Sequence, residues 1–178
     1  MSHPAILDKQ TAALVVVDMQ ESFRKAIPAF AEIASRVVQM IRGFQILNLP
    51  IVVTEQYPKG LGRTAEEILF SLPEDFEFVE KTAFSSCGAR SFTDKLEASG
   101  AKQILLAGIE THVCVNQTAH DLLQNGCQVH LLTDCVGSRF EHDKTAAIQK
   151  MQQSGVIPAT VETALFELMR DSRHEQFK

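Results

Sequence analysis

The chain has 178 residues, of which 45% are hydrophobic and 22% are charged, and its formal net charge is −5. This size and composition favour a single domain, spanning residues 1–178, with a sizeable apolar core. Without a basic stripe we expect no nucleic-acid partner, and since no apolar run reaches about 18 residues we expect no membrane partner.

Short apolar runs alternate along the chain with segments of helical spacing. Six runs predict buried strands, at residues 12–17, 50–54, 76–79, 103–109, 127–133 and 156–161. Helices are predicted at residues 28–47, 91–99, 113–124, 140–154 and 162–170. Pro28 suits a first helical turn, and Gly100 follows a helix end. Apolar strands alternating with helices predict a parallel sheet with helices on both faces, an α/β three-layer sandwich.

The carboxyl ends of parallel strands gather functional groups at one edge of the sheet. Asp18 follows the first predicted strand, Lys81 the third, and Cys114 the fourth. Asp18 could be a phosphoryl-accepting nucleophile, a metal ligand, a base for another nucleophile, or a helix cap. Gln20 stands where a haloacid-dehalogenase-type phosphatase needs a second aspartate, and Lys81 could be a solvated flanking residue. Their joint placement nevertheless predicts a shared site.

The four cysteines form no C-x-x-C pair, so neither a zinc ribbon nor a thioredoxin-type motif is expected. The amino terminus does not have a signal-peptide pattern, so we expect a cytoplasmic, reducing environment with free thiols. Cys114 is predicted at a helix start, where free N–H groups and the helix dipole favour a thiolate. Cys127 begins a strand at the opposite edge, Cys135 follows the fifth strand without a helix start, and Cys87 lies in a loop after Lys81. Cys114 is therefore the candidate nucleophile.

The motifs at these strand ends resemble the isochorismatase-like cysteine hydrolase superfamily over essentially the whole chain. The motifs are Val17-Asp18-Met19-Gln20 with Phe23, Lys81-Thr82-Ala83-Phe84-Ser85, and Gly108-Ile109-Glu110-Thr111-His112-Val113-Cys114 followed by Asn116-Gln117-Thr118-Ala119. The run Thr54-Glu55-Gln56-Tyr57-Pro58-Lys59-Gly60-Leu61-Gly62 is similar to that of short isochorismatase domain-containing proteins. The resemblance implies a six-stranded sheet of order 3-2-1-4-5-6 and a homo-oligomer.

The resemblance also implies how the site is built. It implies a catalytic triad of Asp18, Lys81 and Cys114. The peptide bond between Ile109 and Glu110 is usually cis in this family, and the backbone N–H groups of Glu110 and Cys114 would form an oxyanion hole. The expected substrate-binding residues are Phe23, Gln56, Tyr57, Phe84 and His112.

Two departures from relatives narrow the expected chemistry. Nicotinamidases of this superfamily bind a metal through an Asp-x-His motif and a further histidine, but this chain has Glu55-Gln56-Tyr57 there and no histidine between His3 and His112. We therefore expect no metal and no cofactor. Isochorismate hydrolases cleave a vinyl ether, some of them without the cysteine, so retention of Cys114 favours attack on an amide-like bond of a small molecule. A vinyl-ether hydrolase and a redox-sensing thiol protein are the alternatives.

Overall fold

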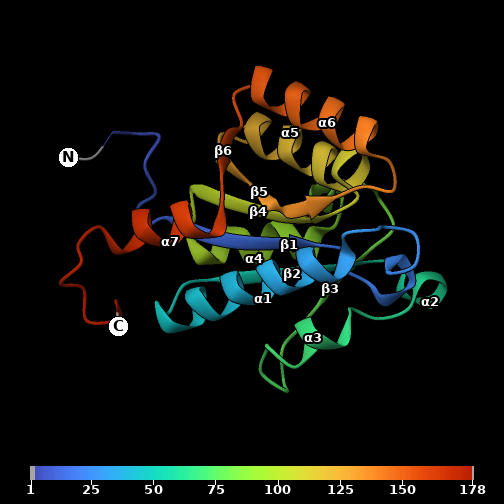
Figure 1. Cartoon of the computed structure of the whole chain (residues 1–178), viewed down its shortest axis with the longest axis horizontal. Coiled ribbons are helices and arrows are strands. Elements are labelled where there is room, and N and C mark those ends of the chain that lie inside the picture. The colour runs from blue at the N-terminus through green and yellow to red at the C-terminus, as the bar shows by residue number, and fades with distance from the viewer. Residues whose placement is uncertain (1–2, 178) are drawn as a thin grey trace.

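A computed structural model describes residues 3–177 as one six-stranded sheet with helices on both faces (Figure 1). The strands are β1 (Ala12–Val17), β2 (Ile51–Gln56), β3 (Val79–Lys81), β4 (Gln103–Ile109), β5 (Gln128–Gly137) and β6 (Ile157–Ala159). The helices are α1 (Phe30–Ile46), α2 (Pro58–Leu61), α3 (Glu66–Leu69), α4 (Arg90–Ser99), α5 (Asn116–Gln124), α6 (Glu141–Gln153) and α7 (Val161–Met169). Shorter helical turns lie at Glu21–Phe23, Ser86–Gly88 and Thr111–Val115.

All the strands run parallel, in the order β3-β2-β1-β4-β5-β6, which confirms the predicted fold class and strand order. Every residue of the central strands β1 and β4 is buried. Successive side chains of a strand point to opposite faces, so β1 contributes Leu14 and Val16 to one apolar cluster and Val15 and Val17 to the other. This two-sided burial explains why both strands read as continuous apolar runs.

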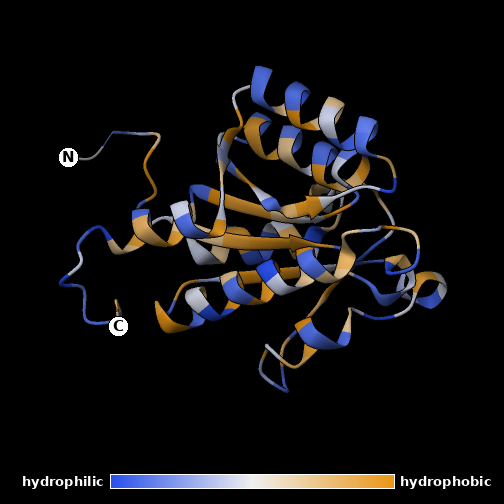
Figure 2. Ribbon diagram, in the orientation of Figure 1, coloured by the Kyte–Doolittle hydropathy of each residue, from blue (hydrophilic) through white to orange (hydrophobic). Residues whose placement is uncertain are grey.

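The helices divide between the two faces. α1, α3 and α7 pack on the face that includes Leu14, whereas α4, α5 and α6 pack on the face that includes Val15. Figure 2 shows the apolar sheet between helices whose outer surfaces are polar. No helix among residues 3–177 has the length and hydrophobicity needed to cross a membrane.

Several predicted boundaries were wrong, and three of these errors affect the site. The third strand spans Val79–Lys81 rather than residues 76–79, so Lys81 belongs to the strand and lies opposite Gln56 of β2. The fifth strand continues to Gly137, which places Cys135 inside it. The helical segment that carries Cys114 begins earlier, with a π-helical turn at Thr111–Val115.

The remaining differences concern element ends and short elements. α1 begins at Phe30, so Pro28 lies in a turn before the helix instead of in its first turn. β2 continues to Gln56, two residues beyond its predicted end. β6 ends at Ala159, because the Thr160 side chain accepts a hydrogen bond from the N–H of Thr163 and starts α7. The short helices α2 and α3 were not predicted.

Candidate active site

Asp18 is the first residue after β1, and its side chain is buried. Its backbone takes a left-handed conformation with φ of 52°, and its N–H donates to the carbonyl oxygen of Thr54 at 3.2 Å. The carboxylate oxygens have separate partners: Oδ1 accepts from the Thr54 hydroxyl at 2.6 Å and Oδ2 accepts from Lys81 Nζ at 2.7 Å. These contacts fix the carboxylate at the carboxyl edge of the sheet and satisfy it there.

The close approach of β4 to β1 at this edge depends on a glycine. Gly108 lies opposite Val17 in the parallel register and has φ of 122°. A Cβ at this position would lie 2.1 Å from the carbonyl oxygen of Val17. Only glycine fits here without displacing a strand. Gly108 therefore allows the chain that leads to Cys114 to pass beside the end of β1.

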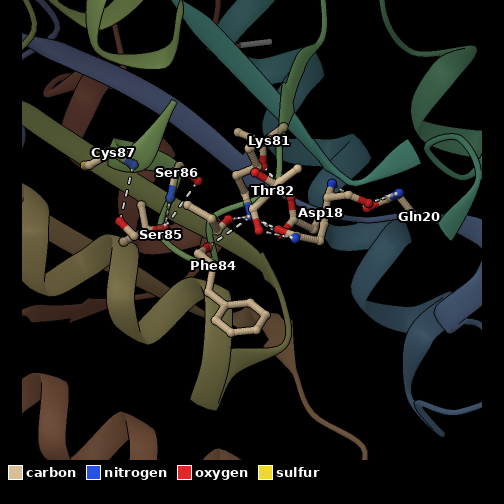
Figure 3. A network of polar contacts seen from close by, with 12 residues as sticks. Asp18, Gln20, Lys81, Thr82, Phe84, Ser85, Ser86 and Cys87 are labelled. Atoms are coloured by element: carbon tan, nitrogen blue, oxygen red, sulfur yellow. Dashed lines mark hydrogen bonds and ion pairs between the residues drawn. The ribbon is translucent and has the colours of Figure 1, made fainter. Parts of the chain in front are cut away.

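Lys81 ends β3, and its side chain is fully buried. Its ammonium nitrogen lies near four oxygens, as Figure 3 shows in part: Asp18 Oδ2 at 2.7 Å, Gln56 Oε1 at 2.7 Å, the Phe84 carbonyl at 3.0 Å and the Ala83 carbonyl at 3.2 Å. An ammonium group has three protons to donate, so this cation is fully hydrogen-bonded. A buried lysine of this kind is a member of the site and not a solvated flanking residue.

Two glutamines hold the lysine and its surroundings. The Gln56 side chain accepts from Lys81 and donates to the Thr82 carbonyl at 2.8 Å, so both ends of its amide are engaged. The Gln20 side chain accepts from the Gln56 N–H at 2.8 Å and donates to the carbonyls of Gln56 and Gly62 at 3.0 and 2.7 Å. Gln56 was expected to bind substrate, and in the structure its side-chain amide is hydrogen-bonded to Lys81 and to the Thr82 carbonyl. The sequence analysis used Gln20 as a motif residue and as evidence against a second phosphatase aspartate, and did not predict these hydrogen bonds.

Cys114 lies in the π-helical turn, buried beside Asp18 and Lys81. Burial and, next in size, the Asp18 carboxylate raise the pKa of its thiol to about 12, although the Lys81 ammonium opposes this effect. The sequence predicted a thiolate at a helix start, and this prediction was wrong because burial and the carboxylate dominate. The three residues of the expected triad do meet at one point, with the cysteine protonated at neutral pH.

The other cysteines lie elsewhere. Cys87 and Cys127 line a surface pocket of about 420 Å³ between α4 and α5, toward the amino ends of β4 and β5. Burial raises the pKa of Cys87 to about 11. Cys135 is fully buried in the apolar cluster that α1 covers, and burial raises its pKa well above the usual value. Cys114 is therefore the cysteine that accompanies Asp18 and Lys81.

Some backbone N–H groups between Glu110 and Val115 donate hydrogen bonds within the part of the chain that the structure describes, and others do not. The peptide bond between Ile109 and Glu110 is cis, as the resemblance implies. The Glu110 carbonyl accepts from the N–H groups of Val113 and Val115 at 3.0 and 3.3 Å, and the Cys114 N–H between them does not share this acceptor. Within residues 3–177 the Glu110 N–H donates no hydrogen bond. These two N–H groups are the ones expected to form an oxyanion hole.

The segment after β5 contacts this turn at two side chains that the sequence analysis did not connect. The Glu110 carboxylate accepts from both the backbone N–H and Nε of Arg139, each at 3.1 Å. The Nδ1 atom of His112 lies 3.0 Å from the Ser138 hydroxyl, and its Nε2 lies 3.9 Å from Asp143 Oδ2. His112 is half-buried and held by the protein, and the contact of Arg139 with Glu110 is one that the sequence analysis missed.

The expected aromatic substrate-binding residues are dispersed. Phe23 is partly buried and packs against the apolar cluster under α1. The ring of Phe84 is 55% exposed and points away from the polar network (Figure 3). Tyr57 is 53% exposed and lines a pocket of about 370 Å³ that also includes Lys81 and Thr82. Among these aromatic residues, Tyr57 is thus the one that lines a pocket shared with the triad lysine.

The residues at the position of the nicotinamidase metal motif, which this chain lacks, have other partners. Glu55 is buried, and its Oε1 accepts from both the N–H and the hydroxyl of Thr64 at 2.8 Å. Its Oε2 lies 3.5 Å from Nε of Arg63. In residues 3–177 no three His, Cys, Asp or Glu side chains are grouped so that they could hold a metal ion. The donor set at Glu55 and Gln56 therefore does not fit a metal.

Comparison with known proteins gives consistent matches over nearly the whole chain. The family model described as Isochorismatase domain matches residues 12–163. Isochorismatase family protein 1A of Dictyostelium discoideum is 39% identical over 175 residues, which cover 97% of this chain and 85% of that protein.

Two solved structures have a similar fold. A structure titled MAR1 ribonuclease, from Caenorhabditis elegans, superimposes with a TM-score of 0.91 at 39% identity, covering 97% of this chain and 88% of that one. The YcaC gene product of Escherichia coli, titled an octameric hydrolase of unknown specificity, gives a TM-score of 0.89 at 25% identity and covers 98% and 87% of the two chains.

Proposed function

This chain belongs to the isochorismatase domain family, and we propose that it is a metal-independent cysteine hydrolase of a small molecule. Membership of this family supports hydrolase activity in general. The bond cleaved is an amide-like C–N bond, and the covalent intermediate forms on Cys114. The observation that carries this proposal is the meeting of three strand ends, where a buried Lys81–Asp18 ion pair of 2.7 Å lies beside the Cys114 thiol.

A protonated thiol needs a base before it can attack. Asp18 takes the Sγ proton of Cys114 while the sulfur bonds to the carbonyl carbon of the substrate. The C=O electrons move to the oxygen, and the N–H groups of Glu110 and Cys114 stabilise this oxyanion. When the C=O bond forms again the C–N bond breaks, and the leaving nitrogen takes the proton from Asp18. The acyl group is then held on Cys114 as a thioester.

The second half repeats these roles with water. Asp18 removes a proton from water as the water oxygen attacks the thioester carbon. The C–S bond breaks, the acid product leaves, and the sulfur takes the proton back from Asp18. Throughout the cycle one negative charge moves between Asp18 and the substrate oxyanion, while the Lys81 ammonium stays beside Asp18 and Cys114. The buried site therefore keeps its charge balance, which is why a fixed cation is useful there.

A matched pair of variants tests this mechanism against the alternative of a vinyl-ether hydrolase. In that alternative Asp18 takes part in proton transfer and no covalent bond forms on Cys114, as in the relatives that lack the cysteine. A covalent mechanism predicts that Cys114→Ala and Asp18→Asn both lose turnover of the substrate found by screening small amides, esters and vinyl ethers. A vinyl-ether hydrolase would keep turnover in Cys114→Ala and lose it only in Asp18→Asn.

The redox-sensing alternative receives less support. An oxidant sensor needs an accessible thiol with a lowered pKa, whereas Cys114 is buried and its pKa is raised.

For partners, the octameric YcaC neighbour supports a homo-oligomer. The four free cysteines fit a reducing, cytoplasmic compartment. The ribonuclease name belongs to the C. elegans protein, and the net charge of −5 in this chain disfavours RNA as its substrate.

A further inference from the structure

Arg139 follows the end of β5 and contacts Glu110, the residue before the turn that carries Cys114. β4 and β5 pair so that Ile109 lies opposite Gly137, which places Arg139 near Glu110. The Glu110 carboxylate accepts from the Arg139 N–H and from Arg139 Nε, each at 3.1 Å. One arginine thus holds both oxygens of one carboxylate through its backbone and its side chain.

The carboxylate on the receiving side is the buried member of the pair. The Glu110 side chain is 8% exposed, while that of Arg139 is 51% exposed. Within residues 3–177 the Glu110 side chain has no hydrogen-bond partner other than Arg139. A buried carboxylate is costly to leave unpaired, so the pair holds Glu110 in one orientation. The neighbouring His112–Ser138 contact of 3.0 Å ties the same two segments together.

We propose that Arg139 is a positioning residue for the oxyanion hole: through the Glu110 carboxylate it fixes the direction of the Glu110 backbone N–H. This inference rests on the proposed function, because it needs an oxyanion that this N–H stabilises. Arg139 acts through Glu110 and makes no contact with the polar atoms of Asp18 or Lys81. A donor that is misdirected by even 1 Å can cost about 100-fold in rate.

Two reagents separate this role from general damage to the site. p-Nitrophenyl acetate acylates a thiol through a tetrahedral oxyanion, and nitrophenolate leaves as the thioester forms. Iodoacetamide alkylates the same thiol by displacing iodide from a saturated carbon, so no oxyanion develops. A residue that positions the oxyanion hole should matter for the first reaction and not for the second.

The experiment measures both rates at Cys114, by mass spectrometry of the full chain and its peptides, in the wild type, Arg139→Gln and Arg139→Lys. We expect Arg139→Gln to slow acylation by roughly 10- to 100-fold and to leave alkylation within about twofold. Arg139→Lys, which keeps a charge for Glu110, should recover part of the acylation rate. Arg90→Gln is the matched control, because Arg90 also pairs through Nε with a carboxylate, that of Asp94, on the exposed surface of α4.

Glu110→Gln should slow acylation to the same extent as Arg139→Gln, and the double variant should be no slower, because the two side chains act as one unit. Equal losses of acylation and alkylation in Arg139→Gln would overturn the proposal, since they would show a structural role. Unchanged acylation of this neutral ester would overturn it too, and would leave Arg139 at most a ligand for charged substrates. If the wild type is not acylated on Cys114 at all, the proposed function itself fails.

Discussion

Lys81 Nζ lies 2.7 Å from Asp18 Oδ2, and the two side chains are 0% and 1% exposed. Buried ion pairs contribute little net stability compared with apolar side chains of the same size, because both charges lose their hydration. The protein nevertheless holds this pair with the Thr54 hydroxyl on the carboxylate and three further oxygens around the ammonium. This arrangement is better explained by the chemistry of the neighbouring Cys114 than by stability.

Removal of one partner of this pair should be costly. Lys81→Met leaves the Asp18 carboxylate buried without its cation, so we expect a loss of about 3–5 kcal/mol in the free energy of unfolding. The double variant Asp18→Asn with Lys81→Met should recover much of that loss. Urea denaturation followed by circular dichroism measures both. The control is Lys95→Met, whose partner Glu77 is exposed, with an expected change below about 1 kcal/mol. Equal midpoints for the two single variants would contradict a buried, interacting pair.

The raised pKa of Cys114 predicts a specific pH dependence of its alkylation. Only the thiolate attacks iodoacetamide, and below the pKa its fraction grows about tenfold for each pH unit. With a pKa of about 12, the alkylation rate of Cys114 should rise continuously from pH 7 to pH 10 without levelling off. The rate is measured on the peptide that contains Cys114. A rate that levels off between about pH 9 and pH 10 would show an ordinary thiol and contradict the buried environment.

Asp18→Asn should change reactivity and catalysis in opposite directions. The Asp18 charge raises the pKa of Cys114, so its removal lowers that pKa and leaves the Lys81 cation beside the sulfur. Alkylation of Cys114 at pH 8 should therefore become faster, by up to about 10-fold for each unit by which the pKa falls. Turnover of substrate should be lost, because no base remains to activate water. A variant in which alkylation is slower instead of faster would contradict the assignment of the raised pKa of Cys114 to the Asp18 charge.

Gly108→Ala should destabilise the fold at the edge that carries the site. The new Cβ would lie 2.1 Å from the Val17 carbonyl oxygen, and φ of 122° is unfavourable for alanine. We expect a loss of about 3 kcal/mol or more in thermal or urea unfolding. Gly126→Ala is the control, because its φ is also positive, at 80°, but no atom lies within 4 Å of its added Cβ. That variant should lose about 1 kcal/mol. Similar losses in both variants would show that the contact with β1 is unimportant.

Sequence patterns were most informative where a residue's environment is set by its neighbours in the chain. β1 and β4 are continuous apolar runs buried on both faces, and their bounds match the prediction to the residue. β3 was predicted too early because a segment with Phe76 and Phe78 is typical of a strand. In the structure their two rings pack edge to face, with centroids 5.1 Å apart. The burial of Lys81 depends on Asp18, which is 63 residues away in the chain.

The site shows the same limit. The positions of Asp18, Lys81 and Cys114 at strand ends could be predicted, since parallel strands bring their carboxyl ends together. The protonation of Cys114 could not, because it depends on how deeply the turn is buried. The contact of Arg139 with Glu110 joins residues that follow two different strands, β5 and β4, and has no sequence motif of its own. Gln20 and Gln56 lie within the family motifs, but their shared hydrogen bonds appear only once β2 is placed beside β1.

The most direct test of the central proposal is the mass of the protein during turnover. The full chain is mixed with an excess of p-nitrophenyl acetate, quenched in acid at successive times, and measured intact and as peptides. We predict an added acetyl group on the peptide that contains Cys114, formed early and lost as the ester is consumed, and absent in Cys114→Ser. Two results together would contradict covalent catalysis by this residue: hydrolysis at the wild-type rate in Cys114→Ala, and no adduct on Cys114 of the wild-type protein at any time.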